Sequence, residues 1–428
     1  MDTDFPRAIL HIDGDAFFVS CELTRKPWLK NRPVVTGQER GMATAVNYTA
    51  KALGVVRGMR VRDIRRLHPE VIILPSDYTL YALYARRMYS IVRKYADIVE
   101  EYSVDECFAD ITGLSEKIGK PARLARMGVA GGSVEEIART IQADLHASLG
   151  MTFSVGVGVN KVTAKVASKW NKPAGLTLIP RGKIRKFLKD LPIGKVWGIG
   201  SATTVRLRKL GLETALDLAD KDRAWVAEHC DKPLAEIYEE FQGAFVKELE
   251  SIRRDPHSIQ HTRTFYPPTR DKAFLWSQIS HHVEEACARL REQDLVAGRA
   301  SFFLKTQSFE YMRTEVRLPE SISEPEGVLN AMKPVFDKTF KSSLLYRAAG
   351  IGLYELGPEH AARQTLFGIP EEVKASRIIH RTIDKLTHRF GAHSVFLGSS
   401  HTALKAKREL TKEAKKKTFS LVFLGEVR

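Results

Sequence analysis

Apolar side chains recur every three or four residues along the stretch after Asp77, as on one face of an α-helix. Asp77 is a typical N-cap residue, so the helix is predicted over 77–95. Ser133 with Glu136 forms a capping box, which predicts a second helix over 134–149. We place the apolar and aromatic stripe of the first helix in the core, not on a base-stacking surface. Its members are Tyr81, Tyr84, Met88, Ile91 and Tyr95.

Short apolar or alternating segments flank these two helices and predict β-strands. One strand is predicted at 8–12, a pair of strands at 97–111 and another strand at 152–159. The order is therefore strand, helix, two strands, helix, strand. That order is typical of the split βαβ, ferredoxin-like arrangement.

The pattern changes after a charged stretch at 248–257, which reads as a linker. Beyond it, strands and helices alternate in a way that predicts a second α+β module. The strands are expected near 258–265, 299–307, 311–318 and 347–354, and the helices near 275–290 and 326–340. A further helix carries Ile379, Ile383, Leu386 and Phe390, and a lysine-rich run follows at 405–417.

Three carboxylates occupy positions where strand residues are expected. Asp13 ends the first strand, while Asp105 and Glu106 lie inside the predicted hairpin, although acidic residues are poor strand formers. Adjacent carboxylates repel each other, and burying them is costly unless a cation or hydrogen-bond donors compensate. A tight turn with a solvated acidic pair is the alternative. If the hairpin pairs with the first strand, all three acids meet at one sheet edge, as in sites of the oxygen-rich type that Mg²⁺ prefers.

Basic residues follow the strand at 152–159. Lys161, Lys165 and Lys169 are four residues apart, hence on one helix face, and a helix start with ammonium groups favours phosphate. A solvated basic face is the alternative. The turn Trp197-Gly198-Ile199-Gly200 resembles a helix-hairpin-helix module, which offers backbone N–H groups to a DNA phosphate; a plain helical turn is the alternative.

Other candidate chemistry is sparse. The four cysteines form no C-x-x-C pair, so neither a zinc knuckle nor a disulfide framework is predicted. The adjacent His281 and His282 lie on a helix-like segment and are interpreted as a surface pair.

Composition narrows the partner. The 428 residues carry a net charge of +16 with a pI near 9.6, which predicts a polyanionic partner. No run approaches a membrane span, and the N-terminus lacks a basic signal-peptide start. We therefore expect nucleic acid as partner, no membrane, and a cytoplasmic location.

Together the motifs resemble, in order and spacing, those of Y-family DNA polymerases, most of all the bacterial DNA polymerase IV branch. The resemblance runs from about residue 7 to about residue 355. It rests on Asp13-Gly14-Asp15-Ala16-Phe17-Phe18, Asn47-Tyr48-x-Ala50-Lys51, Ser103-Val104-Asp105-Glu106, Asn160-Lys161-x-x-Ala164-Lys165 and Trp197-Gly198-Ile199-Gly200.

The resemblance implies a multidomain α+β polymerase shaped like a right hand, with a ferredoxin-like palm. It also implies a template-directed, low-fidelity enzyme that synthesises DNA past damaged bases, with primer–template DNA and dNTPs as partners and a monomeric state. The domains would be palm at 1–14 and 79–168, fingers at 15–78, thumb at 169–247, linker at 248–257, little finger at 258–358 and a basic helical tail at 359–428.

The resemblance also implies roles for individual residues. Asp13, Asp105, Glu106 and the Gly14 carbonyl would hold two Mg²⁺ ions, with Mn²⁺ as a substitute. Phe17 and Phe18 would contact the nucleotide, with Phe18 as the steric gate; a core phenylalanine is the alternative. The triphosphate would be bound by Tyr48, Lys51 and Lys161, and DNA by Gly198, Gly200 and Lys165.

The chain departs from the family pattern in places. Lys51 replaces the usual arginine and lacks its bidentate fork, which puts nucleotide affinity in doubt. Ala45 stands where a hydroxyl residue is common, and Met42 lies in the stretch that roofs the nascent base pair. Gln364, Leu366 and Phe367 partly resemble a sliding-clamp peptide with Gln one residue too close; a hydrophobic staple for the next helix is the other interpretation.

Two further functions stay open at this stage. One is a catalytically silent, DNA-binding scaffold of the same fold acting in the damage response. The other is a nucleotidyl cyclase, which can share the palm topology and its acids. Retention of Asp13, Asp105 and Glu106 argues against the scaffold, and the charge and the thumb-like turn argue against the cyclase.

Overall fold

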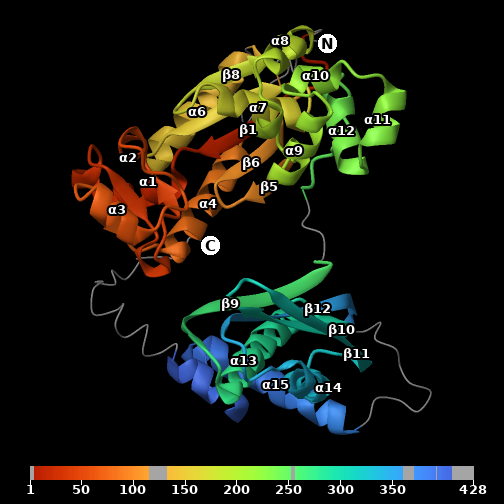
Figure 1. Cartoon of the computed structure of the whole chain (residues 1–428). Coiled ribbons are helices and arrows are strands. Elements are labelled where there is room, and N and C mark those ends of the chain that lie inside the picture. The colour runs from red at the N-terminus through yellow and green to blue at the C-terminus, as the bar shows by residue number, and fades with distance from the viewer. Residues whose placement is uncertain (1–3, 115–132, 252–255, 360–370, 392, 407–428) are drawn as a thin grey trace. The chain divides into compact units, whose positions relative to one another are not determined.

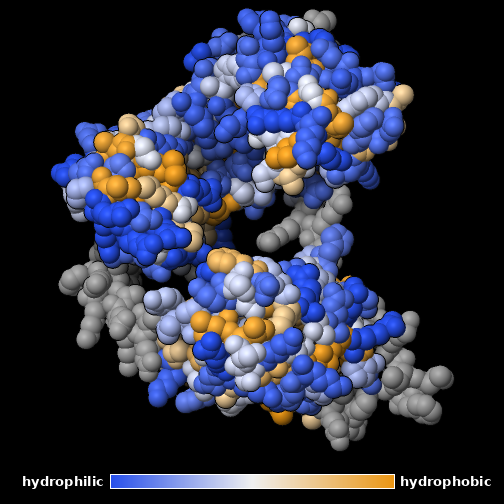
Figure 2. All heavy atoms as spheres, in the orientation of Figure 1, coloured by the Kyte–Doolittle hydropathy of each residue, from blue (hydrophilic) through white to orange (hydrophobic). Residues whose placement is uncertain are grey.

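The computed structural model describes residues 4–114, 133–251, 256–359, 371–391 and 393–406. The chain divides into two compact units, Met1–Arg253 and Arg254–Arg428, and the boundary falls inside the predicted linker (Figure 1). Hydrophilic side chains cover most of the visible face of each unit (Figure 2). Among the described helices, none is long and apolar enough to cross a membrane.

The first unit is built on a five-stranded sheet in the order β5-β6-β1-β7-β8. All neighbours are antiparallel except β7 and β8, which run parallel. The first four strands in chain order confirm the predicted split βαβ arrangement. The strands are β1 (Ile9–Gly14), β5 (Val99–Ser103), β6 (Glu106–Asp110), β7 (Phe153–Gly158) and β8 (Leu176–Ile179).

Strand β8 was not predicted, and it extends this sheet beyond residue 168, where the predicted palm ends. The chain reaches β8 through α7 (Lys161–Trp170), which packs on β1, β7 and β8. Its approach is close: a Cβ on Gly156 would lie 2.1 Å from the Ser168 nitrogen. Glycine is therefore required at that point of β7.

The other sheet face is covered by two helices, α4 (Tyr78–Val92) and α6 (Val134–Leu149). Both predicted caps are confirmed: Asp77 accepts from the Leu80 N–H at 3.0 Å, and Ser133 forms the capping box with Glu136. The stripe predicted for the first helix lies in or against the core. Side chains on β1 alternate between the faces, so Leu10 and Ile12 meet α4 and α6 while His11 and Asp13 face α7.

The predicted fingers contain a small sheet in the order β3-β2-β4 with a separate apolar cluster. Its strands are β2 (Val34–Thr36), β3 (Ala45–Val46) and β4 (Ile72–Leu74), and its helices are α1 (Phe17–Arg25), α2 (Tyr48–Ala52) and α3 (Val61–Leu67). The described part of the first unit also contains five α-helices that follow β8. They are α8 (Ile184–Lys189), α9 (Ser201–Lys209), α10 (Ala215–Ala219), α11 (Arg223–His229) and α12 (Lys232–Phe241).

The second unit contains a four-stranded antiparallel sheet in the order β11-β10-β12-β9. Its core lies between the sheet and two helices on one face. The predicted elements are all present, and the strands are longer than predicted. The bounds are β9 (Ser258–Thr269), α13 (Lys272–Arg291), β10 (Leu295–Thr306), β11 (Tyr311–Ile322), α14 (Pro325–Thr339) and β12 (Tyr346–Pro358).

The predicted C-terminal helix is present as α15 (Glu371–Phe390), and it packs against the second unit. Arg291 binds Asp384 through two hydrogen bonds of 2.7 and 2.8 Å, and Arg377 pairs with Glu324 at 3.1 Å. Polar contacts therefore hold much of this helix. The described part of the predicted tail thus belongs to the fold of the second unit.

The interpretation of His281 and His282 as a surface pair is wrong. They are only 2% and 0% exposed. The reason is that α13 is covered on one side by β9 and β12 and also contacts the chain that follows α15. A helix covered in this way has little solvated surface.

Candidate active site

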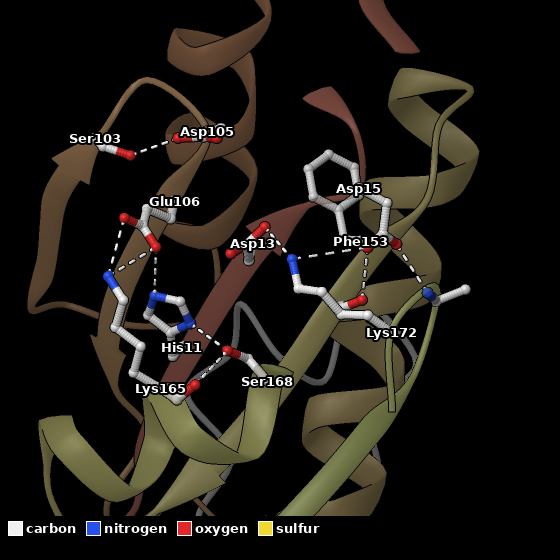
Figure 3. Close-up of polar contacts among 12 residues, drawn as sticks. His11, Asp13, Asp15, Ser103, Asp105, Glu106, Phe153, Lys165, Ser168 and Lys172 are labelled. Carbon is white, nitrogen blue, oxygen red and sulfur yellow. Dashed lines mark hydrogen bonds and ion pairs between the residues drawn. The ribbon is translucent and has the colours of Figure 1, made fainter. Parts of the chain in front are cut away.

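Three acids were predicted to meet at one sheet edge, and strand register brings two of them together. In the antiparallel pair β1–β6, Asp13 lies directly opposite Glu106. The Gly14 N–H donates to the Asp105 carbonyl at 2.8 Å and ties the hairpin to the end of β1. Figure 3 shows Asp13 and Glu106 on neighbouring strands, with Asp105 turned toward Ser103, whose hydroxyl donates to it at 2.6 Å.

Glu106 is held by two donors. His11 Nε2 lies 3.2 Å and Lys165 Nζ 2.9 Å from its carboxylate. Burial raises the pKa of Glu106, but the hydrogen bonds from His11 and Lys165 outweigh this and lower that pKa to about 2. Burial lowers the pKa of His11 to about 4. A neutral imidazole donates at one nitrogen only, so Nε2–H faces the carboxylate and Nδ1 accepts from Ser168 at 2.7 Å.

Asp13 has a different environment. Burial raises its pKa, the ammonium of Lys172 lowers it, and the charges of Glu106 and Asp105 raise it further, so that the pKa is raised overall. Lys172 hydrogen-bonds to Asp13 from the loop that precedes β8. The carboxylate thus sits in a partly desolvated, acidic site that a cation stabilises.

The turn after β1 is shaped by Gly14 and Ala16. A Cβ on Gly14 would lie 2.5 Å from a ring carbon of Phe17, so no larger residue fits without a shift. Ala16 adopts a φ of 46°, in the left-handed region that non-glycine residues rarely occupy. Asp15 between them is buried and accepts from the Ser154 hydroxyl at 2.7 Å and the Ala174 N–H at 2.8 Å. This turn therefore anchors the loop that carries Lys172.

Two of the predicted triphosphate residues lie at the same place. Tyr48 donates to Asp15 at 3.3 Å, and the Lys51 ammonium lies 4.1 Å from the centre of the Tyr48 ring. Burial, and then the charge of Lys172, lower the pKa of Lys51. Two ammonium groups thus face one region beside the carboxylates.

Lys172 was missed by sequence reasoning. Its position depends on β8, which runs parallel to β7 and therefore begins at the sheet edge where Asp13 lies. A lysine just before a parallel strand returns to that edge. The signal was available only if the short segment at 176–179 had been recognised as a strand.

The structure does not bring Lys161 to this region. Lys161 is 6% exposed and binds both oxygens of Glu100 at 2.8 and 2.7 Å. Lys165, predicted to bind DNA, is 4% exposed and is the partner of Glu106. In the structure this face of α7 packs on the sheet, and both lysines pair with acids there, Lys161 with Glu100 and Lys165 with Glu106. Their contacts with phosphate and DNA stay predictions.

Phe17 and Phe18, both predicted to contact the nucleotide, have different environments. Phe17 is buried in the core, and its predicted contact with the nucleotide stays a prediction. Phe18 is partly exposed and stacks on Tyr81 with ring centres 4.3 Å apart, while Tyr78 meets it edge-on at 5.8 Å. Phe18 is thus a rigidly supported aromatic face.

The glycine turn before α9 has the geometry of a tight connection. Gly198 has a φ of 89°, and a Cβ there would lie 2.9 Å from Ile237. Gly200 caps α9, and Trp197 donates to the Tyr102 hydroxyl at 3.0 Å. The residues of the predicted clamp peptide, Gln364, Leu366 and Phe367, lie outside the described residues.

Family models match three segments of the chain. Residues 12–169 match the impB/mucB/samB family, residues 256–366 its C-terminal domain, and residues 181–212 the IMS family HHH motif. The third match covers the turn at Gly198 and Gly200.

Curated relatives and solved structures agree with these matches. A DNA polymerase IV of Desulfatibacillum aliphaticivorans is 30% identical over 396 residues, covering 90% of this chain and 95% of the relative. One from Lactococcus lactis subsp. cremoris (strain MG1363) is 31% identical over 369 residues, covering 84% and 96%.

A Y-family DNA polymerase chimera of Dbh and Dpo4 has a TM-score of 0.67 at 23% identity, covering 82% of this chain and 99% of its own. An insertion ternary complex of Dbh DNA polymerase has a TM-score of 0.53 at 22% identity, covering 81% and 98%. At such identities the likeness shows a common fold.

Proposed function

Since the chain belongs to the Y family of DNA polymerases, of the DNA polymerase IV type, and is a DNA-directed DNA polymerase, we propose that it copies damaged templates with low fidelity. Its reaction is transfer of a nucleotidyl group from a dNTP to a primer 3′-OH at Asp13, Asp105 and Glu106. The observation that carries the site is the register that sets Asp13 opposite Glu106, with Asp105 tied to Gly14.

The donor set suits divalent metal, on which this polymerase family depends. Three carboxylates and the Gly14 carbonyl are hard oxygen ligands, and we propose two Mg²⁺ ions there, with Mn²⁺ as a substitute. When bound, such ions polarise the phosphate and favour ionisation of the attacking hydroxyl. Asp105 would reach them by turning away from Ser103, while His11 and Lys165 keep Glu106 ionised and oriented.

We assign the triphosphate to Lys172, Lys51 and Tyr48. The two ammonium groups neutralise its charge and that of the departing pyrophosphate, and the buried Asp15 fixes the loop and the tyrosine that present them. Lys172 thereby replaces Lys161 in the predicted set. Phe18 serves as the steric gate, because its ring is held on Tyr81 and cannot yield easily to a ribose 2′-OH.

Duplex DNA is assigned to the glycine turn before α9 and to the second unit's sheet. Side chains on the sheet face opposite α13 and α14 include Arg299, Lys305, Arg313 and Arg317, by strand alternation and register. The net charge of +16 supports a polyanionic ligand.

The decisive experiment is extension of a labelled primer–template with dNTPs and Mg²⁺, comparing wild type with Asp105→Ala. We expect template-directed extension that is lost in the variant while DNA affinity is retained. Wild type that binds the duplex and never extends it, with Mg²⁺ or Mn²⁺, contradicts the proposal and favours the silent scaffold.

Two additions test the finer parts. A template with an abasic site or a bulky guanine adduct tests damage bypass, which fails as a proposal if every lesion stops extension. Phe18→Ala tests the gate: we expect ribonucleotide incorporation to rise by at least about tenfold relative to dNTP, since the loss of a shape contact is worth roughly 1–3 kcal/mol.

A further inference from the structure

Outside the candidate active site, three ligand-type side chains meet in the second unit. They are His281 and Glu285 on α13, and His393 on the chain just after α15. One ligand atom from each lies within 4.8 Å of the other two. The positions 281 and 285 are one helical turn apart, so both side chains project from the same face of α13.

The distances fit a small metal ion. His393 Nε2 lies 3.5 Å from a Glu285 oxygen, and the His281 and His393 ring centres are 5.0 Å apart. Ligand atoms about 2.0–2.1 Å from a tetrahedral zinc are separated by ~3.4 Å, so small side-chain adjustments close the set. Two imidazoles and one carboxylate are typical ligands for zinc and poor ones for Mg²⁺.

Burial differs among the three. His281 is 2% exposed, while the side chains of His393 and Glu285 are 20% and 30% exposed. One side of the site is therefore closed by the protein and the other is open to solvent, where a water would complete the four-coordination of a bound ion. Two more histidines, His261 and His282, pack beside His281. The Nδ1 atoms of His261 and His282 are 2.8 Å apart.

The chain around His393 is positioned independently of the three ligands. Glu284, next to Glu285, accepts from the Leu397 N–H at 2.6 Å and from the Ser400 hydroxyl. Ser277 accepts from the Ala403 N–H at 3.0 Å. His393 has a φ of 64°, a left-handed conformation that a non-glycine residue adopts at some cost. The fold thus brings one strained histidine back to α13.

We propose that His281, Glu285 and His393 bind one zinc-class divalent ion, which clips residues 393–406 to α13. The ion joins two segments more than 100 residues apart, so its role is structural. The site is separate from the carboxylates of the polymerase reaction, and its occupancy does not depend on that activity.

The test uses the full, untagged chain, since a histidine tag would itself bind zinc. The protein is treated with a chelator, dialysed, and titrated with Zn²⁺ against a chromophoric competitor in excess Mg²⁺, which occupies the carboxylate site. We expect one Zn²⁺ per chain. Co²⁺ is expected to give the strong visible absorption of a four-coordinate ion.

The variants separate ligation from folding. His393→Asn removes the imidazole while asparagine tolerates the left-handed backbone, and Glu285→Gln keeps the side-chain shape. Each is expected to weaken Zn²⁺ binding by at least about tenfold. His388→Ala, an exposed histidine on α15, is the matched control and should leave the affinity unchanged. His393→Cys keeps a zinc ligand and should retain binding.

A structural readout completes the test. Zn²⁺ is expected to slow amide hydrogen exchange across residues 393–406 in wild type and in the control, with no such effect in His393→Asn. Equal Zn²⁺ affinity in wild type and His393→Asn, or no Zn²⁺ retained by folded wild type, overturns the proposal. Circular dichroism confirms that each variant is folded.

Discussion

At the residue scale, two lysines that look alike in sequence have opposite roles. Lys172 hydrogen-bonds to Asp13 beside the proposed triphosphate site, whereas Lys161 neutralises the buried Glu100. We expect Lys172→Ala to raise KM for dNTP by roughly tenfold or more, because a hydrogen bond to a charged group is worth about 1.5–3 kcal/mol. Steady-state insertion of one nucleotide measures this, with thermal unfolding as the control for stability.

Lys161→Ala should behave differently. It leaves Glu100 buried without its partner, which costs about 3–5 kcal/mol of folding free energy. The variant should therefore unfold at lower temperature, with KM for dNTP unchanged in the fraction that stays folded. A raised KM at unchanged stability would restore Lys161 to the nucleotide site.

Lys165 provides a second prediction at this scale. Because its ammonium binds Glu106 and is buried, Lys165→Ala should lower kcat by at least about tenfold and leave DNA affinity unchanged. Fluorescence anisotropy with a labelled duplex measures the affinity. Weaker DNA binding at unchanged kcat would instead support the direct phosphate contact predicted from sequence.

At the element scale, much of the first unit could be predicted, because helix caps and hydrophobic periods are local signals. Asp77 and Ser133 marked helix starts correctly, and the order of strands predicted the sheet. The side-chain partners could not be predicted. Whether Lys165 contacts water or Glu106 depends on which face of α7 packs on the sheet. A helix that directs lysines toward buried acids lacks the hydrophobic period that would reveal its buried face in the sequence.

The attachment of α15 is predicted to depend on one ion pair. Asp384 is the bidentate partner of the largely buried Arg291, so Asp384→Asn should increase hydrogen exchange throughout α15, at a cost of about 1.5–3 kcal/mol. Asp337→Asn on α14 is the matched control. Its partners Lys333 and Lys272 are half exposed, and water screens such a surface pair, so the exchange of α15 should not change.

The same helix should respond to acid through Glu326, which hydrogen-bonds to His380 at 2.8 Å. Partial burial raises the pKa of Glu326, but the His380 contact outweighs this, and the pKa is lowered from its usual 4.5. A depressed folded pKa stabilises the fold above the unfolded value, and this contribution is lost as pH falls below about 4.5. We expect α15 exchange to increase in that range, and less steeply in His380→Gln.

At the scale of the whole molecule, the described residues form two units with separate hydrophobic cores. The residues of the main core of the first unit lie between Phe5 and Phe241 in the sequence, and those of the second unit's core lie between Ile259 and Leu353. Each unit is large enough to fold cooperatively, and a core that is not shared gives no reason for one unit to unfold with the other. We therefore expect two calorimetric transitions in the full chain.

Variants placed in different units assign the transitions. Asp384→Asn should lower only one midpoint, and Lys161→Ala only the other, since each disrupts contacts inside one unit. DNA binds basic surfaces assigned to both units, so adding a primer–template should raise both midpoints, and less so at high salt, because release of condensed counterions drives such binding. A single transition that both variants shift equally would mean that the units unfold as one, and the separate cores would then not define separate folding units.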